Sequence, residues 1–157
     1  MMYRVSEIDD NRRKRAITNG VLRALPDWFG IEESIVEYVE QSDGMMFWAA
    51  YAAERPVGFL SLLQHNAYTF EIYCMGILQE FHHRGIGRAL VQAGENYCAA
   101  QGAEFLTVKT LDESRPDDGY AKTRQFYLAM GFRPLEVFPT LWDEANPCLF
   151  LAKSIHR

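Results

Sequence analysis

The chain has 157 residues, of which 48% are hydrophobic and 24% are charged, so a disordered or fibrous chain is excluded. This length is typical of one globular domain, and we expect a single domain over residues 1–157. Lys and Arg number 16 against 21 Asp and Glu. The resulting net charge of −5 argues against nucleic acid as the main partner and permits a cationic, amine-bearing one.

The compartment is indicated by what the sequence lacks. No apolar run approaches the roughly 20 residues that span a bilayer, and the N-terminus has no signal-peptide pattern. The three cysteines, Cys74, Cys98 and Cys148, are odd in number and show no C-x-x-C spacing, which favours reduced thiols. We therefore expect a cytoplasmic protein that does not associate with a membrane.

The first elements in chain order are a short strand and two helices. Residues 3–6 are predicted as a strand, and Asp9 or Asp10 can cap a helix that ends near Leu25. A second helix is predicted over residues 32–41. The basic cluster at 12–15 has two interpretations, a contact with a phosphate or acidic partner and the solvated face of the first helix.

The remaining pattern alternates strands with helices. Strands are predicted over 45–53, 57–64 and 69–78, then a helix over 85–101, a strand over 105–109, an acidic loop over 112–119, a helix over 121–130, and strands over 132–138 and 148–152. This order predicts an α/β (α+β layered) domain. We expect a central mixed, mostly antiparallel twisted sheet of about seven strands flanked by about four helices.

The segment from residue 71 to 90 is predicted as a strand, a tight glycine-bearing turn and the start of a helix. Unpaired N–H groups at a helix N-terminus bind anions, and Arg84 and Arg88 add positive charge, so a pyrophosphate fits. Leu90 stands where the dinucleotide fingerprint requires Gly, and no Lys-Ser or Lys-Thr follows Gly85 or Gly87 as in a Walker loop. The alternative is that the two glycines serve tight packing only.

Two motifs about forty residues apart give this chain a family resemblance. Residues 82–87 read His-His-Arg-Gly-Ile-Gly and residues 126–132 read Phe-Tyr-Leu-Ala-Met-Gly-Phe. Over most of its length the chain resembles the GNAT superfamily of N-acetyltransferases, whose loop normally reads Arg/Gln-x-x-Gly-x-Gly/Ala and whose later motif reads Tyr-x-x-x-Gly-Phe. Two positions depart from the family pattern, His82 in place of Arg or Gln and Tyr120 in place of a frequent Asn.

The resemblance implies a GNAT-like acyl-CoA N-acyltransferase fold with acetyl-CoA as cosubstrate and no metal. It also implies direct transfer of the acetyl group to a primary amine of a small molecule or a protein, and it allows a homodimer. The alternative is a non-catalytic acyl-CoA-binding or sensing domain. By position, the residues implied to contact the cofactor are Met75, Gly76 and Ile77 on the pantetheine arm and His82, His83, Arg84, Gly85, Ile86, Gly87 and Arg88 on the pyrophosphate.

Transfer to an amine requires a base and benefits from an acid. Glu71 is the candidate base because it lies in an otherwise apolar strand at the offset of the catalytic Glu in a histone-acetylating branch, where desolvation raises a carboxyl pKa. Its alternatives are a water-facing strand end, a pair with an Arg, and deprotonation through ordered waters. Tyr127 is the candidate acid for the leaving thiolate, with core packing as its alternative. Cys74 is interpreted as a buried thiol rather than a nucleophile.

Aromatic and acidic residues are the candidates for the pocket that binds the acceptor. Trp28 and Trp142 are candidates for its walls, whereas Trp48 is better explained as core. Acidic residues between 112 and 118 are able to attract a cationic acceptor, or they form a solvated loop. His82 and His83 have no Asp, Glu or Cys at ligand spacing, so we expect no metal site at these residues.

Overall fold

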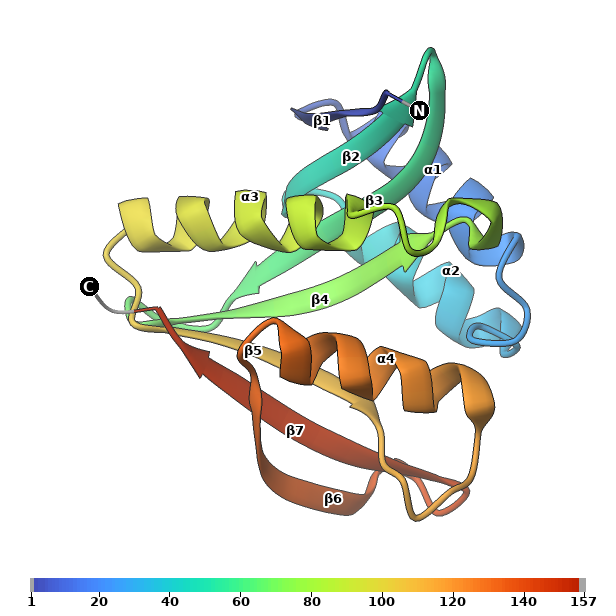
Figure 1. Ribbon diagram of the computed structural model, residues 1–157, viewed down its shortest axis with the longest axis vertical. Helices are drawn as coiled ribbons and strands as arrows, with labels where there is room; N and C mark the ends of the chain where they lie inside the picture. The colour runs from blue at the N-terminus through green and yellow to red at the C-terminus, as the bar shows by residue number, and fades with distance from the viewer. Residues whose placement is uncertain (1, 156–157) are drawn as a thin grey trace. The chain divides into compact units, whose positions relative to one another are not determined.

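The computed structural model describes residues 2–155 and shows a mixed sheet accompanied by four α-helices (Figure 1). The elements are β1 (Arg4–Glu7), α1 (Asn11–Arg23), α2 (Glu32–Gln41), β2 (Met46–Ala52), β3 (Arg55–Gln64), β4 (Thr69–Ile77), the 3₁₀ turn η1 (Gln79–Phe81), α3 (Ile86–Ala100), β5 (Phe105–Leu111), α4 (Asp118–Ala129), β6 (Arg133–Asp143) and β7 (Asn146–Ser154). The strand order is β1-β2-β3-β4-β5-β7-β6, with β4 and β5 parallel. Pairing is antiparallel for β1–β2, β2–β3, β5–β7 and β6–β7. The predicted mixed, mostly antiparallel sheet of seven strands is confirmed.

Two compact units make up this part of the chain. Unit 1 contains the residues up to Leu63 together with Tyr73–Tyr97, and unit 2 contains Gln64–Ile72 together with the residues from Cys98 onward. Strand β4 therefore begins in unit 2 and ends in unit 1.

The helix boundaries follow from their caps. Asp10 accepts the N–H of Arg12 at 3.1 Å, so α1 begins where the predicted cap placed it. Helix α4 begins at Asp118 because Asp117 accepts the N–H of Tyr120 at 2.9 Å. The prediction of a loop over 112–119 was therefore wrong for its last two residues.

The last two strands are longer than the hydrophobic pattern predicts. Strand β6 was predicted to end at residue 138 but continues to Asp143, and β7 begins at Asn146 rather than Cys148. The side chains of β6 are exposed or half-exposed along its whole length. Because neither face of this strand is buried, its sequence does not alternate between apolar and polar residues. The hydrophobic pattern therefore does not reveal where the strand ends.

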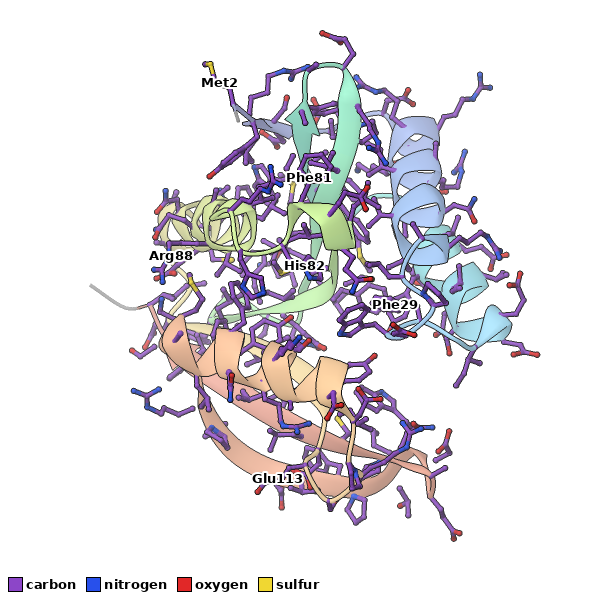
Figure 2. All side chains as sticks on the ribbon, turned by 45° about the vertical axis from the view of Figure 1, so that its right-hand side comes forward. Met2, Phe29, Phe81, His82, Arg88 and Glu113 are labelled. Atoms are coloured by element: carbon purple, nitrogen blue, oxygen red, sulfur yellow. The ribbon has the colours of Figure 1, made fainter. Side chains whose placement is uncertain are left out.

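In unit 1, α1 and α3 lie on opposite sides of the strands (Figures 1 and 2). At Gly76 on β4, α1 and the residues just after it approach closely, because a Cβ there would lie 3.1 Å from Val21 Cγ1 and 3.3 Å from Leu25 Cδ1. The missing side chain lets the helix approach, and Val21 and Leu25 are buried against the strand. This contact fixes the end of β4, from which the candidate cofactor loop departs.

In unit 2, β5 is the central strand. It pairs in parallel with β4, where Glu71 lies opposite Thr107, and antiparallel with β7, where Lys109 lies opposite Phe150. Leu106 and Val108 are buried in the core. Because strand side chains alternate, Thr107 and Lys109 point to the other face of the strand.

Candidate active site

The loop between β4 and α3 has a backbone suited to binding an anion. After η1, His83 and Gly85 adopt positive φ angles of 62° and 82°, and α3 begins at Ile86. The N–H groups in the first turn of a helix have no acceptor within that helix, and Ala89 is the residue that donates back to Gly85 O, at 3.0 Å. A ligand such as a phosphate group can supply acceptors for N–H groups of this kind.

The side chain of His82 is used inside the loop. Its Nε2 lies 2.7 Å from the carbonyl oxygen of Ile77, the last residue of β4, and its ring lies edge-on to Trp28 with centroids 5.6 Å apart. Since a carbonyl only accepts, Nε2 must carry the proton. The imidazole thus ties the loop to the end of β4. His82 is the position that departs from the Arg or Gln of the motif quoted above.

Two cations and one buried residue complete the loop. The guanidinium carbon of Arg84 lies 5.5 Å from the Phe81 ring centroid, and Arg88 is exposed on the first turn of α3 (Figure 2). Ile86 is 1% exposed and anchors α3 in the core, so its backbone rather than its side chain is available to a ligand. Tyr3 Oη donates to Gly85 O at 3.2 Å and braces the turn.

The strand residues predicted to contact the pantetheine arm lie at the unit 1 end of β4. Met75 and Ile77 are half-buried, and Gly76 is buried against α1. The strand end is fixed by two hydrogen bonds, from Leu78 N–H to Val57 O at 2.9 Å and from Ser61 Oγ to Cys74 O at 3.4 Å. These residues and the loop belong to one compact unit.

Glu71 lies in unit 2 within a cluster of basic side chains. Its own side chain is 7% exposed, and Lys109 Nζ donates to both of its carboxylate oxygens at 3.0 Å. His65 Nε2 lies 2.6 Å from Glu71 Oε1. The expected apolar surroundings of Glu71 are thus basic as well as apolar, and the partner is a Lys rather than the Arg considered from the sequence.

His65 and Lys109 were missed by sequence reasoning. Lys109 is the only charged residue in β5, and the parallel register that puts Glu71 opposite Thr107 also puts Lys109 on the same face. A lysine within an apolar strand was the available signal for that contact. His65 gave none, because its contact depends on the shape of the turn between β3 and β4.

The thiols of Cys148 and Cys74 are not set up to act as nucleophiles. Cys148 is fully buried on β7, and burial raises its pKa to about 11, with Lys109 opposing and Glu71 reinforcing that shift. Burial also raises the pKa of Cys74 far above its ordinary value. Both groups are neutral thiols at physiological pH, which agrees with the interpretation of Cys74 as a buried thiol.

The Tyr127 ring is 7% exposed and lies in the unit 2 core. Its centroid is 5.5 Å from that of Phe126 and 5.6 Å from that of Phe132. The core packing that the sequence offered as the alternative role of Tyr127 is therefore present. Its role as an acid stays a prediction.

The three tryptophans occupy different environments. Trp48 is 7% exposed against Tyr97, which confirms its place in the core. Trp28 is half-buried beside His82 in unit 1, whereas Trp142 is 45% exposed on β6 in unit 2. Their roles in acceptor binding stay predictions.

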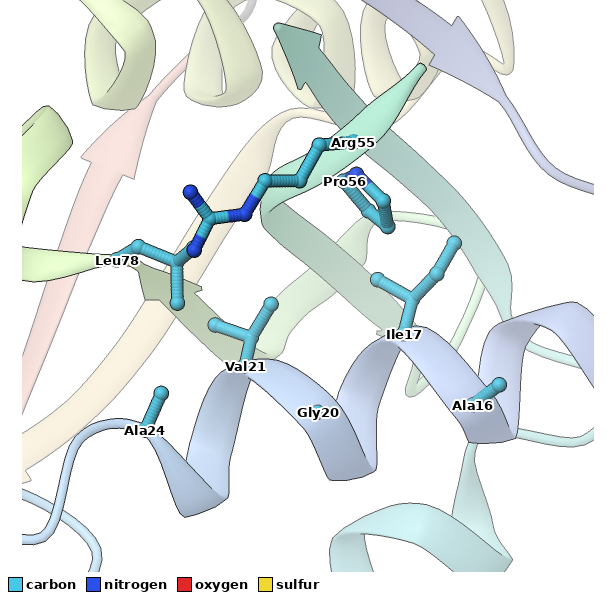
Figure 3. A pocket seen from close by; sticks show the side chains of 8 residues that line it. All are labelled: Ala16, Ile17, Gly20, Val21, Ala24, Arg55, Pro56 and Leu78. Atoms are coloured by element: carbon cyan, nitrogen blue, oxygen red, sulfur yellow. The ribbon is translucent and has the colours of Figure 1, made fainter.

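A pocket in unit 1 contains none of the predicted site residues (Figure 3). Its lining comes mainly from one side of α1, with Arg55, Pro56 and Leu78 opposite. Arg55 also donates to Glu80 Oε1 at 3.1 Å. Among residues 2–155, no group of three His, Cys, Asp or Glu is arranged to hold a metal ion. No helix in that range is long and apolar enough to cross a membrane.

Comparison with known proteins gives a consistent family signal. The family model described as an acetyltransferase (GNAT) domain matches residues 43–134. An uncharacterized N-acetyltransferase of Chlorobaculum tepidum is 25% identical over 119 residues, covering 74% of this chain. The chain spans 66% of that protein's length, just under two thirds.

Solved structures share the fold. A putative GNAT-family acetyltransferase from Desulfovibrio desulfuricans superposes with a TM-score of 0.80 at 17% identity, covering 98% of this chain and 99% of that one. An aminoglycoside 6'-N-acetyltransferase complexed with coenzyme A gives 0.77 at 22% identity, covering 100% and 98%. At these identities the likeness is one of fold.

Proposed function

Because the chain belongs to the GNAT family of acetyltransferase domains, we propose that it transfers an acetyl group from acetyl-CoA directly to a primary amine. The observation that carries the proposal is the β4–α3 loop, with its positive-φ turn, first-turn N–H groups and two arginines in one compact unit. The family match contains this loop, Glu71 and Tyr127, and it extends over residues of both units. That extent supports a single catalytic domain over residues 1–157.

The residues of the loop fit a pyrophosphate. His82 to Arg88 would hold it through backbone N–H groups and the side chains of Arg84 and Arg88. Met75 to Ile77 would present backbone groups to the pantetheine arm. Acetyl-CoA supplies the activated acetyl thioester, and the coenzyme A complex of a protein with the same fold supports this choice of cosubstrate.

The chain's own side chains would move two protons. An amine of pKa near 10.4 is neutral in only about one molecule in 2,500 at pH 7, so a base is needed before it can attack. Glu71, held in one orientation by Lys109, would accept that proton on its carboxylate. Tyr127 would donate its hydroxyl proton to the departing thiolate sulfur.

The acceptor is proposed as a small cationic amine, with a protein side chain or N-terminus as the other candidate. The net charge of −5 favours a cation, and one protein of the same fold is named for an aminoglycoside acceptor. Trp28 and Trp142 would line the acceptor pocket. Both lie outside the family match, which agrees with a part of the protein that varies with the acceptor. We place this activity in the cytoplasm.

Thermal unfolding with and without acetyl-CoA, with ATP and NAD as controls, tests the cofactor assignment. A ligand at a hundred times its Kd adds about 2.7 kcal/mol, which is roughly 5–10 °C for a domain of this size. We expect this shift with acetyl-CoA alone, followed by release of free thiol when an accepted amine is added. Binding without thiol release across an amine panel would favour the non-catalytic acyl-CoA-binding alternative. No shift at millimolar acetyl-CoA would overturn the proposal.

A further inference from the structure

The turn between β3 and β4 brings one titratable side chain against the buried carboxylate of Glu71. His65 Nε2 lies 2.6 Å from Glu71 Oε1, and the His65 side chain is 42% exposed whereas that of Glu71 is 7% exposed. His65 N–H also donates to Thr69 O at 3.0 Å, and Asn66 Oδ1 accepts the N–H of Tyr68 at 2.8 Å. The backbone of the turn is therefore closed by hydrogen bonds on both sides of Asn66.

Glu71 is held from two directions by groups of different character. From β5, Lys109 donates to both oxygens at 3.0 Å. From the turn, His65 offers an imidazole, the side chain that ordinarily changes charge between pH 5 and 8. The third group, Cys148 on β7, is a buried thiol with a pKa of about 11 and contributes no charge there. Of these three groups around Glu71, His65 is the imidazole.

We infer that His65 is a positioning residue that controls whether Glu71 accepts the proton of the amine. The inference rests on the proposed role of Glu71 as the base. A neutral imidazole donates Nε2–H to Oε1 and orients the carboxylate, with Lys109 as the single adjacent positive charge. A protonated imidazole adds a second positive charge, which stabilises the carboxylate form and weakens it as a proton acceptor. Turnover should therefore fall where the imidazole is protonated.

The test does not need turnover in its first arm. Carbon-13 NMR of glutamate-labelled protein follows the Glu71 carboxyl resonance from pH 4 to 9, assigned with Glu71→Gln. We expect a step near neutral pH that reports the charge of His65 and disappears in His65→Gln, whose amide donates without titrating. His65→Asn is the second variant, and His83→Gln, in the other unit, is the matched control that should keep the step. An unchanged Glu71 curve in His65→Gln would overturn the inference.

The second arm measures kcat against pH with acetyl-CoA and kanamycin as the amine probe. His65→Gln should keep at pH 5.5 about ten times more of its pH 8 rate than the wild type keeps. Gln64→Ala removes a hydrogen bond of the same turn, to Asn66 O, and should leave the profile unchanged. If Glu71→Gln turns over as fast as wild type, the proposed base is wrong. That result overturns the inference together with the base, whereas an unchanged Glu71 curve in His65→Gln overturns the inference alone.

Discussion

The cofactor loop of unit 1 and the Glu71 cluster of unit 2 are built in opposite ways. The loop is largely exposed and relies on backbone, through two positive-φ residues and the start of a helix, and His82 ties it to the end of β4. The cluster surrounds the buried carboxylate of Glu71 and relies on side chains from a turn and two strands, joined by contacts of 2.6 to 3.0 Å. A backbone site tolerates exchange of most of its side chains, whereas a side-chain cluster fails when one member is lost.

The largest expected effect is on the cluster. Glu71→Gln removes the proton acceptor while keeping the shape, so we expect kcat to fall about a hundredfold to a thousandfold, within the range of general base catalysis. The pH–rate profile should lose its acid limb. Stabilisation by acetyl-CoA should remain, because the loop residues lie in the other unit. Steady-state kinetics from pH 5 to 9 measure this, and an unchanged profile would remove Glu71 from the mechanism.

Tyr127→Phe separates chemistry from packing in unit 2. The ring contacts with Phe126 and Phe132 survive the change, so the melting temperature should move little. Loss of the hydroxyl proton should lower kcat by about a hundredfold, the lower end for general acid catalysis. A kcat equal to that of the wild type would show that Tyr127 contributes packing alone.

Lys109→Met tests the cluster as a structural unit. Removing one partner of a buried ion pair leaves Glu71 charged and poorly solvated, and with Lys109 27% exposed we expect a loss of about 2–3 kcal/mol. Urea unfolding measures the loss. The matched double variant Glu71→Gln with Lys109→Met should recover much of it, since no unpaired carboxylate remains. Equal losses in the single and double variants would contradict a coupled pair.

The contiguity of the loop residues and the separation of the cluster residues decide what the sequence can predict. The loop was predictable because Gly85, Gly87 and the arginines are contiguous, and one turn of backbone needs those residue types. Glu71 was predictable as an acid in an apolar strand. Its partners come from other parts of the chain, and the contact of His65 is set by a turn whose geometry no residue pattern records. Strand β6 was cut short for a related reason, since an exposed strand carries no burial pattern.

The smallest effect is expected for Arg88→Ala, which tests the cofactor loop of unit 1. Arg88 is an exposed side chain beside N–H groups that carry most of the proposed binding, so its removal should weaken acetyl-CoA by roughly threefold to tenfold. The wild-type Kd should rise with salt more steeply than that of the variant, because one screened charge contact is gone. Calorimetric titration at two salt concentrations measures both effects, and Arg12→Ala, an exposed arginine on α1 outside the loop, is the control. A loss far above tenfold would mean that this site, like the Glu71 cluster, depends on single side chains.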